Sequence, residues 1–187
     1  RVDKLETSAG SMSDAELMVG LMQVSALADN GHDSFNFGDG GWVPPKRAKV
    51  RLAWFPDGIV IARAAPEYRD LLGAKVTRLD GLTPHQVMGH LRKLGGGTDA
   101  YRSWNLMWVL ETGSALHAMG LAAAPDRLNL ELTLRDGRRV ARRIDFGTRA
   151  EIPRGVGPAR ILSAEPYGPE AARGWRAAID PAREPLY

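Results

Sequence analysis

The chain has 187 residues, of which 44% are hydrophobic and 25% are charged, a balance typical of a globular protein with a real core. Its 25 basic and 22 acidic residues give a net charge of +3, too weak a bias to indicate a nucleic-acid partner. The absence of cysteine excludes disulfides and thiolate zinc sites. No apolar run approaches the roughly 18 residues of a membrane span, and the opening sequence RVDKLETSAG lacks the apolar region of a signal peptide.

The first predicted helix begins at a capping box. Ser13 and Glu16 have the spacing at which each side chain can bond the backbone N–H of the other residue. The residues that then recur at helical spacing are Leu17, Leu21, Val24 and Ala28. Asn30-Gly31 supplies a residue able to take a positive φ and end the helix, so His32 comes directly after the helix end.

Alternating and β-branched residues predict two strands after a glycine- and proline-rich loop at 35–48. Residues 50–54 alternate apolar with charged or small side chains, and residues 59–62 are mostly β-branched and apolar throughout. The intervening Pro56-Asp57-Gly58 is typical of a turn. These features predict a strand, a turn and a buried strand.

A short helix, a strand and a longer helix are predicted next. Residues 66–72 begin with proline, which suits the first position of a helix, and residues 74–79 predict a strand. After the Asp80-Gly81 turn, Thr83 and Pro84 are typical of the N-cap and first helical positions. The apolar face of this helix consists of Val87, Met88, Leu91 and Leu94.

Residues 99–121 predict two helical segments that are broken near Thr112-Gly113, and a hairpin follows. The leucines of its first strand share one face, namely Leu128, Leu130, Leu132 and Leu134. A two-residue Asp136-Gly137 turn would set this face against arginines. We expect a longer or bulged turn that pairs Leu134 with Val140 and Leu130 with Ile144, because burial selects the register.

The segment FPDGIVIARAAPEYRDLLGAKVTRLDGLTPHQVMGHLRKL resembles the PDZ-like domain of S41-type serine peptidases, the C-terminal-processing and tricorn-core-like enzymes. LLGAKVTRLDG matches their small helix, glycine, strand and Asp-Gly turn. The helix ending in ALADNGHDSF is similar to an element of the helical cap in the tricorn-like branch. The resemblance covers roughly residues 5–150.

The sequence and the resemblance together predict an α+β fold in three parts. Residues 1–48 form a small helical cap, residues 49–150 form a PDZ-like β-domain with a helical insertion at 98–121, and residues 151–187 form an extended tail or linker. The family's catalytic core, with its nucleophilic serine, is not among these segments. We therefore expect the non-catalytic, substrate-recognition portion of a longer peptidase, inactive alone and without a cofactor.

The resemblance also implies partners and a compartment. The expected partners are a peptide or unfolded protein substrate and a catalytic core on the same polypeptide, while nucleic acid and a membrane span are not expected. Because the family is often exported, the implied location is the periplasm or the cell exterior. The alternative function is a stand-alone peptide- or protein-binding module without any connection to a peptidase.

His32 is the predicted catalytic contribution. In tricorn-like members the matching histidine is the general base for a serine of the core, and a neutral imidazole near pH 7 suits that role. A turn histidine that bonds the helix end is the alternative interpretation. A triad within His32-Asp33-Ser34 is not expected, since triad members usually come from separate segments.

The predicted peptide site lies between the apolar strand and the following helix. PDZ-type domains bind an extended peptide as an added strand at this place. Backbone N–H groups near Gly58 and Ile59 would receive the C-terminal carboxylate of the peptide, and Val60 belongs to the same peptide-binding strand. Val87 or Leu91 would line a side-chain pocket. In the alternative interpretation, these residues only pack the core and the groove is closed.

Two other site classes find little support in the sequence. His85 and His90 are five residues apart, which does not align metal ligands on a helix face, and His117 stands alone. We therefore expect no metal site. The arginines around the hairpin turn could contact phosphates, but acidic residues lie among them; they are Arg135, Arg138, Arg139, Arg142 and Arg143.

Overall fold

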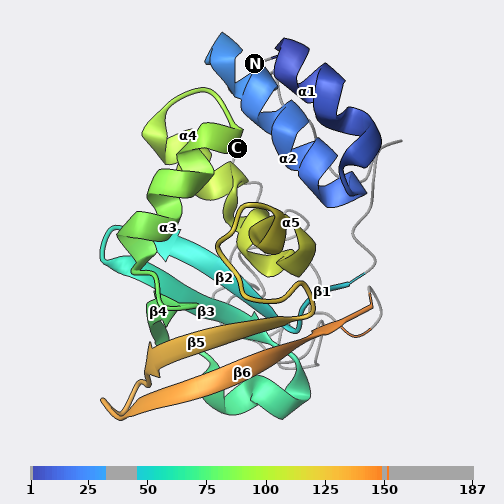
Figure 1. Ribbon diagram of the computed structural model, residues 1–187. Coiled ribbons are helices and arrows are strands. Elements are labelled where there is room, and N and C mark those ends of the chain that lie inside the picture. The colour runs from blue at the N-terminus through green and yellow to red at the C-terminus, as the bar shows by residue number, and fades with distance from the viewer. Residues whose placement is uncertain (1, 33–45, 149–150, 152–187) are drawn as a thin grey trace, which may run out of the picture.

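The computed structural model describes residues 2–32, 46–148 and 151. It confirms the predicted α+β class, because helices pack against a six-stranded antiparallel sheet. Helix α5 lies over one face of the sheet, and α1 and α2 lie beyond it as a separate pair (Figure 1). Within the described residues, no helix is long and apolar enough to cross a membrane. Of the predicted loop at 35–48, residues 35–45 lie outside the described residues, and Arg47–Ala48 form strand β1 instead of loop. Of the predicted tail at 151–187, residues 152–187 lie outside the described residues.

The described elements are short helices and strands. The α-helices are α1 (Val2–Ser8), α2 (Asp14–Ser25), α3 (Pro84–Leu91), α4 (Asp99–Asn105) and α5 (Gly113–Ala118). The 3-10 helices are η1 (Ala9–Ser11), η2 (Ala26–Ala28), η3 (Pro66–Leu71), η4 (Arg92–Leu94) and η5 (Met107–Glu111). The strands are β1 (Arg47–Ala48), β2 (Val50–Phe55), β3 (Gly58–Ala64), β4 (Lys75–Leu79), β5 (Arg127–Thr133) and β6 (Arg139–Gly147).

The sheet has the strand order β1-β6-β5-β4-β3-β2. Although β1 and β2 occupy opposite ends of this order, only Lys49 separates them in the chain. The Lys49 N–H donates to the Asp145 carbonyl oxygen at 3.1 Å, and the Lys49 carbonyl oxygen accepts from the Ala65 N–H at 2.8 Å. The segment 47–55 therefore links the two edges of the sheet, and the sheet must curl to allow it.

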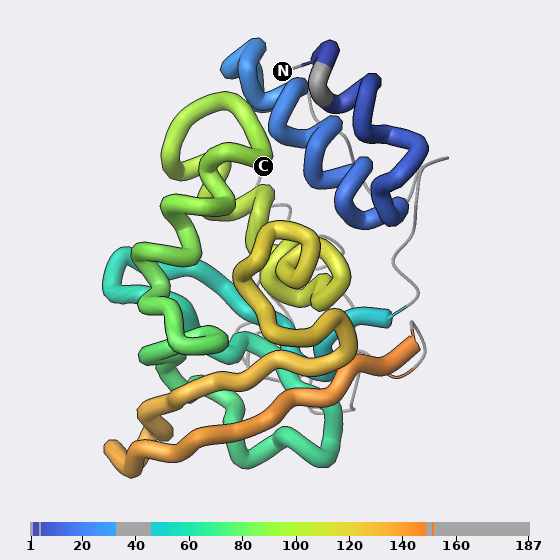
Figure 2. Tube along the Cα trace, viewed as in Figure 1, coloured from blue at the N-terminus to red at the C-terminus, as the bar shows by residue number. Residues whose placement is uncertain are grey.

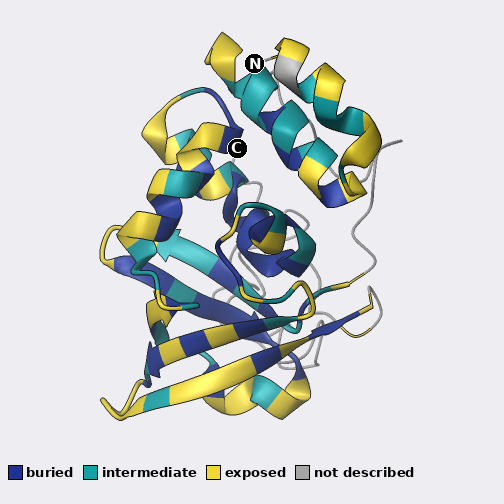
Figure 3. Cartoon of the chain, in the orientation of Figure 1, coloured by how far each residue is buried: buried dark blue, intermediate teal, exposed yellow. Residues whose placement is uncertain are grey.

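One hydrophobic core joins the helices to the sheet. Val19 and Met22 of α2 belong to the same buried cluster as Ile61 of β3 and Leu116 of α5. The buried positions gather where the helices face the sheet (Figure 3). The stretch 1–48 that the sequence assigns to a cap therefore shares the core of the sheet, and its last two described residues form β1.

Helix α2 begins at the predicted capping box but buries a different face from the predicted one. Ser13 Oγ accepts from the Glu16 N–H at 3.3 Å, and Glu16 Oε2 accepts from the Ser13 N–H at 2.8 Å. The buried residues are Ala15, Val19 and Met22, whereas Leu17, Leu21 and Val24 are half-buried and Ala28 is exposed. The predicted stripe is wrong because α2 has neighbours on two sides.

Helix α1 supplies one of those neighbours and was not predicted. A Cβ added at Gly20 of α2 would collide with Leu5 Cδ1 of α1, so the glycine lets the two helices approach closely. The C-terminal end of this region also differs from expectation. Asp29, with φ of 51°, takes the left-handed conformation after η2, one residue before the predicted Asn30-Gly31.

Helix α3 confirms the predicted start and face. Thr83 is the N-cap, Pro84 is the first helical residue, and Gln86 completes a capping box. Val87, Met88, Leu91 and Leu94 are all buried. Local capping therefore fixes where the helix begins, and the apolar spacing fixes which face it buries.

Thr83→Ala is expected to lower the free energy of unfolding by about 1 kcal/mol, because the Gln86 N–H loses its side-chain acceptor. Gln86→Glu keeps a side-chain acceptor at residue 86 and leaves Thr83 unchanged. It serves as the matched control, and little change in the free energy of unfolding is expected. Urea denaturation of both variants measures the effect. Identical unfolding midpoints for Thr83→Ala and the natural protein would contradict this account of the cap.

Strands β5 and β6 run side by side as a hairpin (Figure 2). The hairpin has the predicted faces but a different register. Leu132 pairs with Val140, and Leu128 pairs with Ile144, so the predicted pairing is wrong by two residues. The Leu134 N–H donates to the Arg138 carbonyl oxygen at 2.8 Å, which closes a three-residue turn. The turn is longer than two residues, as expected. A two-residue shift keeps the same side chains on the leucine face.

Candidate functional site

A pocket of about 710 Å³ lies beside β2, within the size range of ligand-binding pockets. Residues of β2, η4, α4 and η5 line it, so the helical insertion forms one wall and the sheet edge forms the other. The lining side chains that matter for its chemistry are Trp54, Trp104, Trp108, Met107, Arg51 and Glu111.

The edge of β2 faces this pocket. Among the described strands, β2 pairs only with β3. The Leu52 N–H points away from β3 and donates to Glu111 Oε1 at 2.9 Å. Because peptide groups alternate in direction along a strand, the peptide group of Trp54 faces the same side as that of Leu52. An edge of this kind is a template to which another extended chain can be added.

Glu111 connects the insertion to the sheet edge. Its side chain is 3% exposed and forms ion pairs with Arg47 Nη2 at 2.7 Å and with Arg51 Nη1. Burial raises the pKa of the Glu111 carboxyl and lowers the pKa of the Arg47 guanidinium, and the attraction between the opposite charges opposes both shifts. The carboxylate therefore holds η5 against β1 and β2 and closes one end of the pocket.

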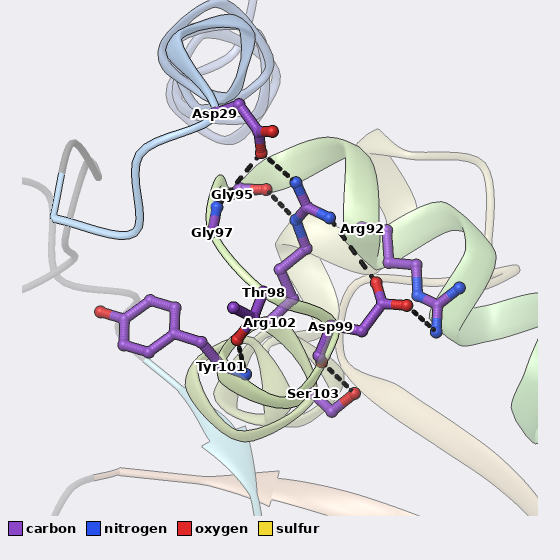
Figure 4. A network of polar contacts seen from close by, with 9 residues as sticks. All are labelled: Asp29, Arg92, Gly95, Gly97, Thr98, Asp99, Tyr101, Arg102 and Ser103. Atoms are coloured by element: carbon purple, nitrogen blue, oxygen red, sulfur yellow. Dashed lines mark hydrogen bonds and ion pairs between the residues drawn. The ribbon is translucent and has the colours of Figure 1, made fainter.

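A second cluster fixes the loop before His32 (Figure 4). The Gly97 N–H donates to Asp29 Oδ1 at 3.2 Å and to the Asp29 carbonyl oxygen at 3.3 Å. Arg102 of α4 pairs with the same carboxylate, and its Nε donates to the Gly95 carbonyl oxygen at 2.9 Å. Asp29 is thereby tied to both the glycine segment and α4.

The three glycines after η4 permit this contact. A Cβ on Gly96 would lie 2.6 Å from Asp29 C and 2.8 Å from Asn30 O, and closer still to Asn30 N. These are backbone atoms, which cannot move aside as a flexible side chain can. The glycine segment 95–97 therefore allows the backbone of residues 29–31 to pack closely against it. The sequence alone did not indicate this role.

His32 is exposed at the end of this fixed loop. Its N–H donates to Asn30 Oδ1 at 3.1 Å, and its ring centroid lies 6.5 Å from that of Tyr101 in α4. The Tyr101 ring lies 6.0 Å from Trp104, which is 74% exposed and lines the pocket. A row of three aromatic rings thus leads from His32 to the pocket. Asp33 and Ser34 lie outside the described residues.

The predicted peptide-binding residues do not form an open groove. Gly58, Ile59 and Val60 belong to β3, which pairs with β2 on one side; Ile59 and Val60 also pair with β4 on the other. An added strand therefore cannot pair with Ile59 or Val60. Val87 and Leu91 are 0% exposed and belong to the core. Within the described sheet, β2 is an edge strand, and it lies one strand away from the predicted position.

Sequence reasoning missed the residues that build the actual pocket. The sequence singles out neither the tryptophans as the wall of a binding site nor Glu111 and Arg51. The surroundings of His85 also differ from those of a metal ligand. Its ring packs edge-on against that of Trp54, with 5.6 Å between the ring centroids. Within the described ranges, no group of three or more His, Asp or Glu side chains could hold a metal ion.

Three hairpin arginines have acidic neighbours. Arg138 pairs with Asp136 at 2.8 Å, Arg142 with Asp70 at 3.4 Å, and Arg143 with Asp145 at 3.6 Å. These pairs reduce the net charge that the hairpin presents.

The comparisons with known proteins identify no relative of this chain, so the features that bear on its function are the pocket and His32. No family model matches the chain, and no curated protein or solved structure matches it.

Proposed function

We propose that this chain is the substrate-recognition and regulatory portion of an S41-like serine peptidase. It binds or gates an extended peptide or unfolded protein for a catalytic core that carries the nucleophilic serine. Its β-domain is PDZ-like, its partner is the core of the same polypeptide, and its compartment is the periplasm or the cell exterior. His32 contributes the general base.

One observation carries the proposal: a pocket lies beside β2, which is an edge strand of the described sheet. PDZ-type domains bind an extended peptide as an additional strand at a sheet edge, with a neighbouring helix as the second wall. Here α4 and η5 take the place of that second wall. The order of β3, η3, β4 and α3 also agrees with the sequence motif on which the resemblance depends.

The position of His32 supports the catalytic part. The contacts of Asp29 with Gly97 and Arg102 hold the loop, while the imidazole itself remains exposed. A general base must be accessible to a nucleophile and held in place. The exposure of His32 and the fixed loop before it support this role, and a serine from a separate core could approach the imidazole from the solvent side.

The test is peptidase activity of the protein encoded by the full gene, with and without His32→Ala. The variant is expected to lose about 10²–10⁴-fold in cleavage rate while keeping its melting temperature, because the His32 ring is exposed. His90→Ala, a histidine of α3 without a proposed role, is the matched control and should cleave normally.

The outcome also separates the alternative function. Full cleavage by His32→Ala would assign His32 to a structural turn and leave the chain with recognition only. A full-length protein that binds unfolded substrate but never cleaves it would favour the stand-alone peptide- or protein-binding module, for which the edge of β2 is the supporting observation.

A further inference from the structure

The pocket walls are aromatic on both sides. Trp54 extends from β2, Trp104 from α4, and Trp108 from η5. Trp54 and Trp108 are half-buried and packed against the core, which holds their rings in place. Trp104 is 74% exposed, although it belongs to the pocket wall. Aromatic rings that surround a space favour another aromatic ring over an aliphatic group of similar area.

Each charged residue that lines the pocket has a partner of opposite charge. Arg51 pairs with Glu111. Arg92 pairs with Asp99 at 3.5 Å, as Figure 4 shows. Asp99 also lies 3.6 Å from Arg102. A charged ligand group would therefore have to displace an existing partner or enter without one, and burying a charge without a partner is costly. The complementary occupant is uncharged.

The edge of β2 restricts how an extended chain can lie. The Leu52 N–H is already bonded to Glu111, so an added strand cannot use it. The peptide group of Trp54, two residues along the same edge, faces the pocket. A bound chain would therefore pair with β2 around Trp54 and would place its side chain among the tryptophans.

From these three observations we infer that the pocket binds an extended, uncharged peptide segment through an aromatic side chain. The inference rests on the proposed function, since it names the substrate class of the same site. The aromatic side chain occupies the space between β2 and α4, and the peptide backbone pairs with the β2 edge at Trp54. The peptide termini take no part in recognition.

Four pentapeptides with acetylated and amidated ends test the inference by calorimetric titration. They share the sequence Ala-Thr-Xaa-Thr-Ala, in which Xaa is Phe, Leu, Lys or Glu. We expect the Phe peptide to bind about 2–10-fold more tightly than the Leu peptide, which is the range of an additional aromatic pair. The Lys and Glu peptides should bind at least tenfold more weakly than the Phe peptide.

Two variants complete the experiment. Trp104→Ala is expected to bring the Phe-to-Leu affinity ratio close to one, and its exposed position makes misfolding from lost packing small. Leu27→Ala, which removes another exposed hydrophobic side chain, should leave the ratio unchanged. Equal affinities for all four peptides would overturn the aromatic preference while peptide binding itself stands. No binding of any peptide would contradict the proposed recognition function and the inference together.

Discussion

Glu111→Ala is expected to lower the free energy of unfolding by about 3–5 kcal/mol, the range for removing one partner of a buried ion pair. The truncation leaves Arg47 and Arg51 without their common carboxylate and the Leu52 N–H without an acceptor. In the described structure, the Nε atoms of both arginines are already buried without a hydrogen-bond partner. The substitution therefore leaves two guanidinium charges without their carboxylate partner, and both charges contribute to the loss of stability.

Chemical denaturation of three variants separates the causes. Glu131→Ala removes a 59% exposed carboxylate that lies 3.9 Å from Arg78, and it should cost less than about 1 kcal/mol. Changing Arg47, Arg51 and Glu111 together to Met should recover most of the loss, since apolar replacement of a whole buried ion cluster is often neutral or stabilising. If Glu111→Ala and Glu131→Ala lower the free energy of unfolding equally, the buried cluster of Arg47, Arg51 and Glu111 does not make the expected contribution to stability.

The dependence on Glu111 also shows why the sequence could not indicate the pocket. Glu111 and Arg51 are 60 residues apart, and neither belongs to a local motif. Only the fold brings η5 against β2. By contrast, the start of α3 depends on residues within one helical turn, Thr83, Pro84 and Gln86, and the sequence predicted its cap and first helical position correctly.

Predictions of burial failed where the tertiary neighbours were unknown. The periodicity of α2 offered more than one apolar stripe, and packing against α1 and α5 selected Val19 and Met22. In the hairpin, burial correctly put Val140 and Ile144 on the leucine face. It could not choose between registers that differ by two residues, because both keep that face.

The candidate site shows the same limit at the β2 edge. Ile59 lies in an apolar, β-branched run that predicts a buried strand, and the structure agrees. A buried strand with neighbours on both sides cannot accept a further strand, so the run that most clearly predicts a strand is the wrong place for a peptide. Whether a strand is central or at an edge depends on long-range pairing, which the local pattern does not contain.

Gly96→Ala is the second large effect, and it tests the loop before His32. The added Cβ meets backbone atoms of Asp29 and Asn30 at 2.6 and 2.8 Å. We expect it to destabilise the fold by about 1–3 kcal/mol, as overpacking does. The loop 29–31 should separate from the glycine segment, so that amide hydrogen exchange rises at the Gly97 N–H, which loses its bonds to Asp29.

Gly89→Ala is the matched control because it has the opposite expected sign. Gly89 is an exposed residue inside α3, and a Cβ there would meet nothing within 4 Å. Alanine in a helix interior should therefore stabilise the protein by about 0.5–1 kcal/mol. If both variants stabilise the fold, the loop 29–31 does not rest on Gly96. If Gly96→Ala alone destabilises the fold and also lowers cleavage by the full-length protein, the contact at Gly96 positions His32. This conclusion follows because Gly96 contacts the loop 29–31 and His32 comes directly after that loop.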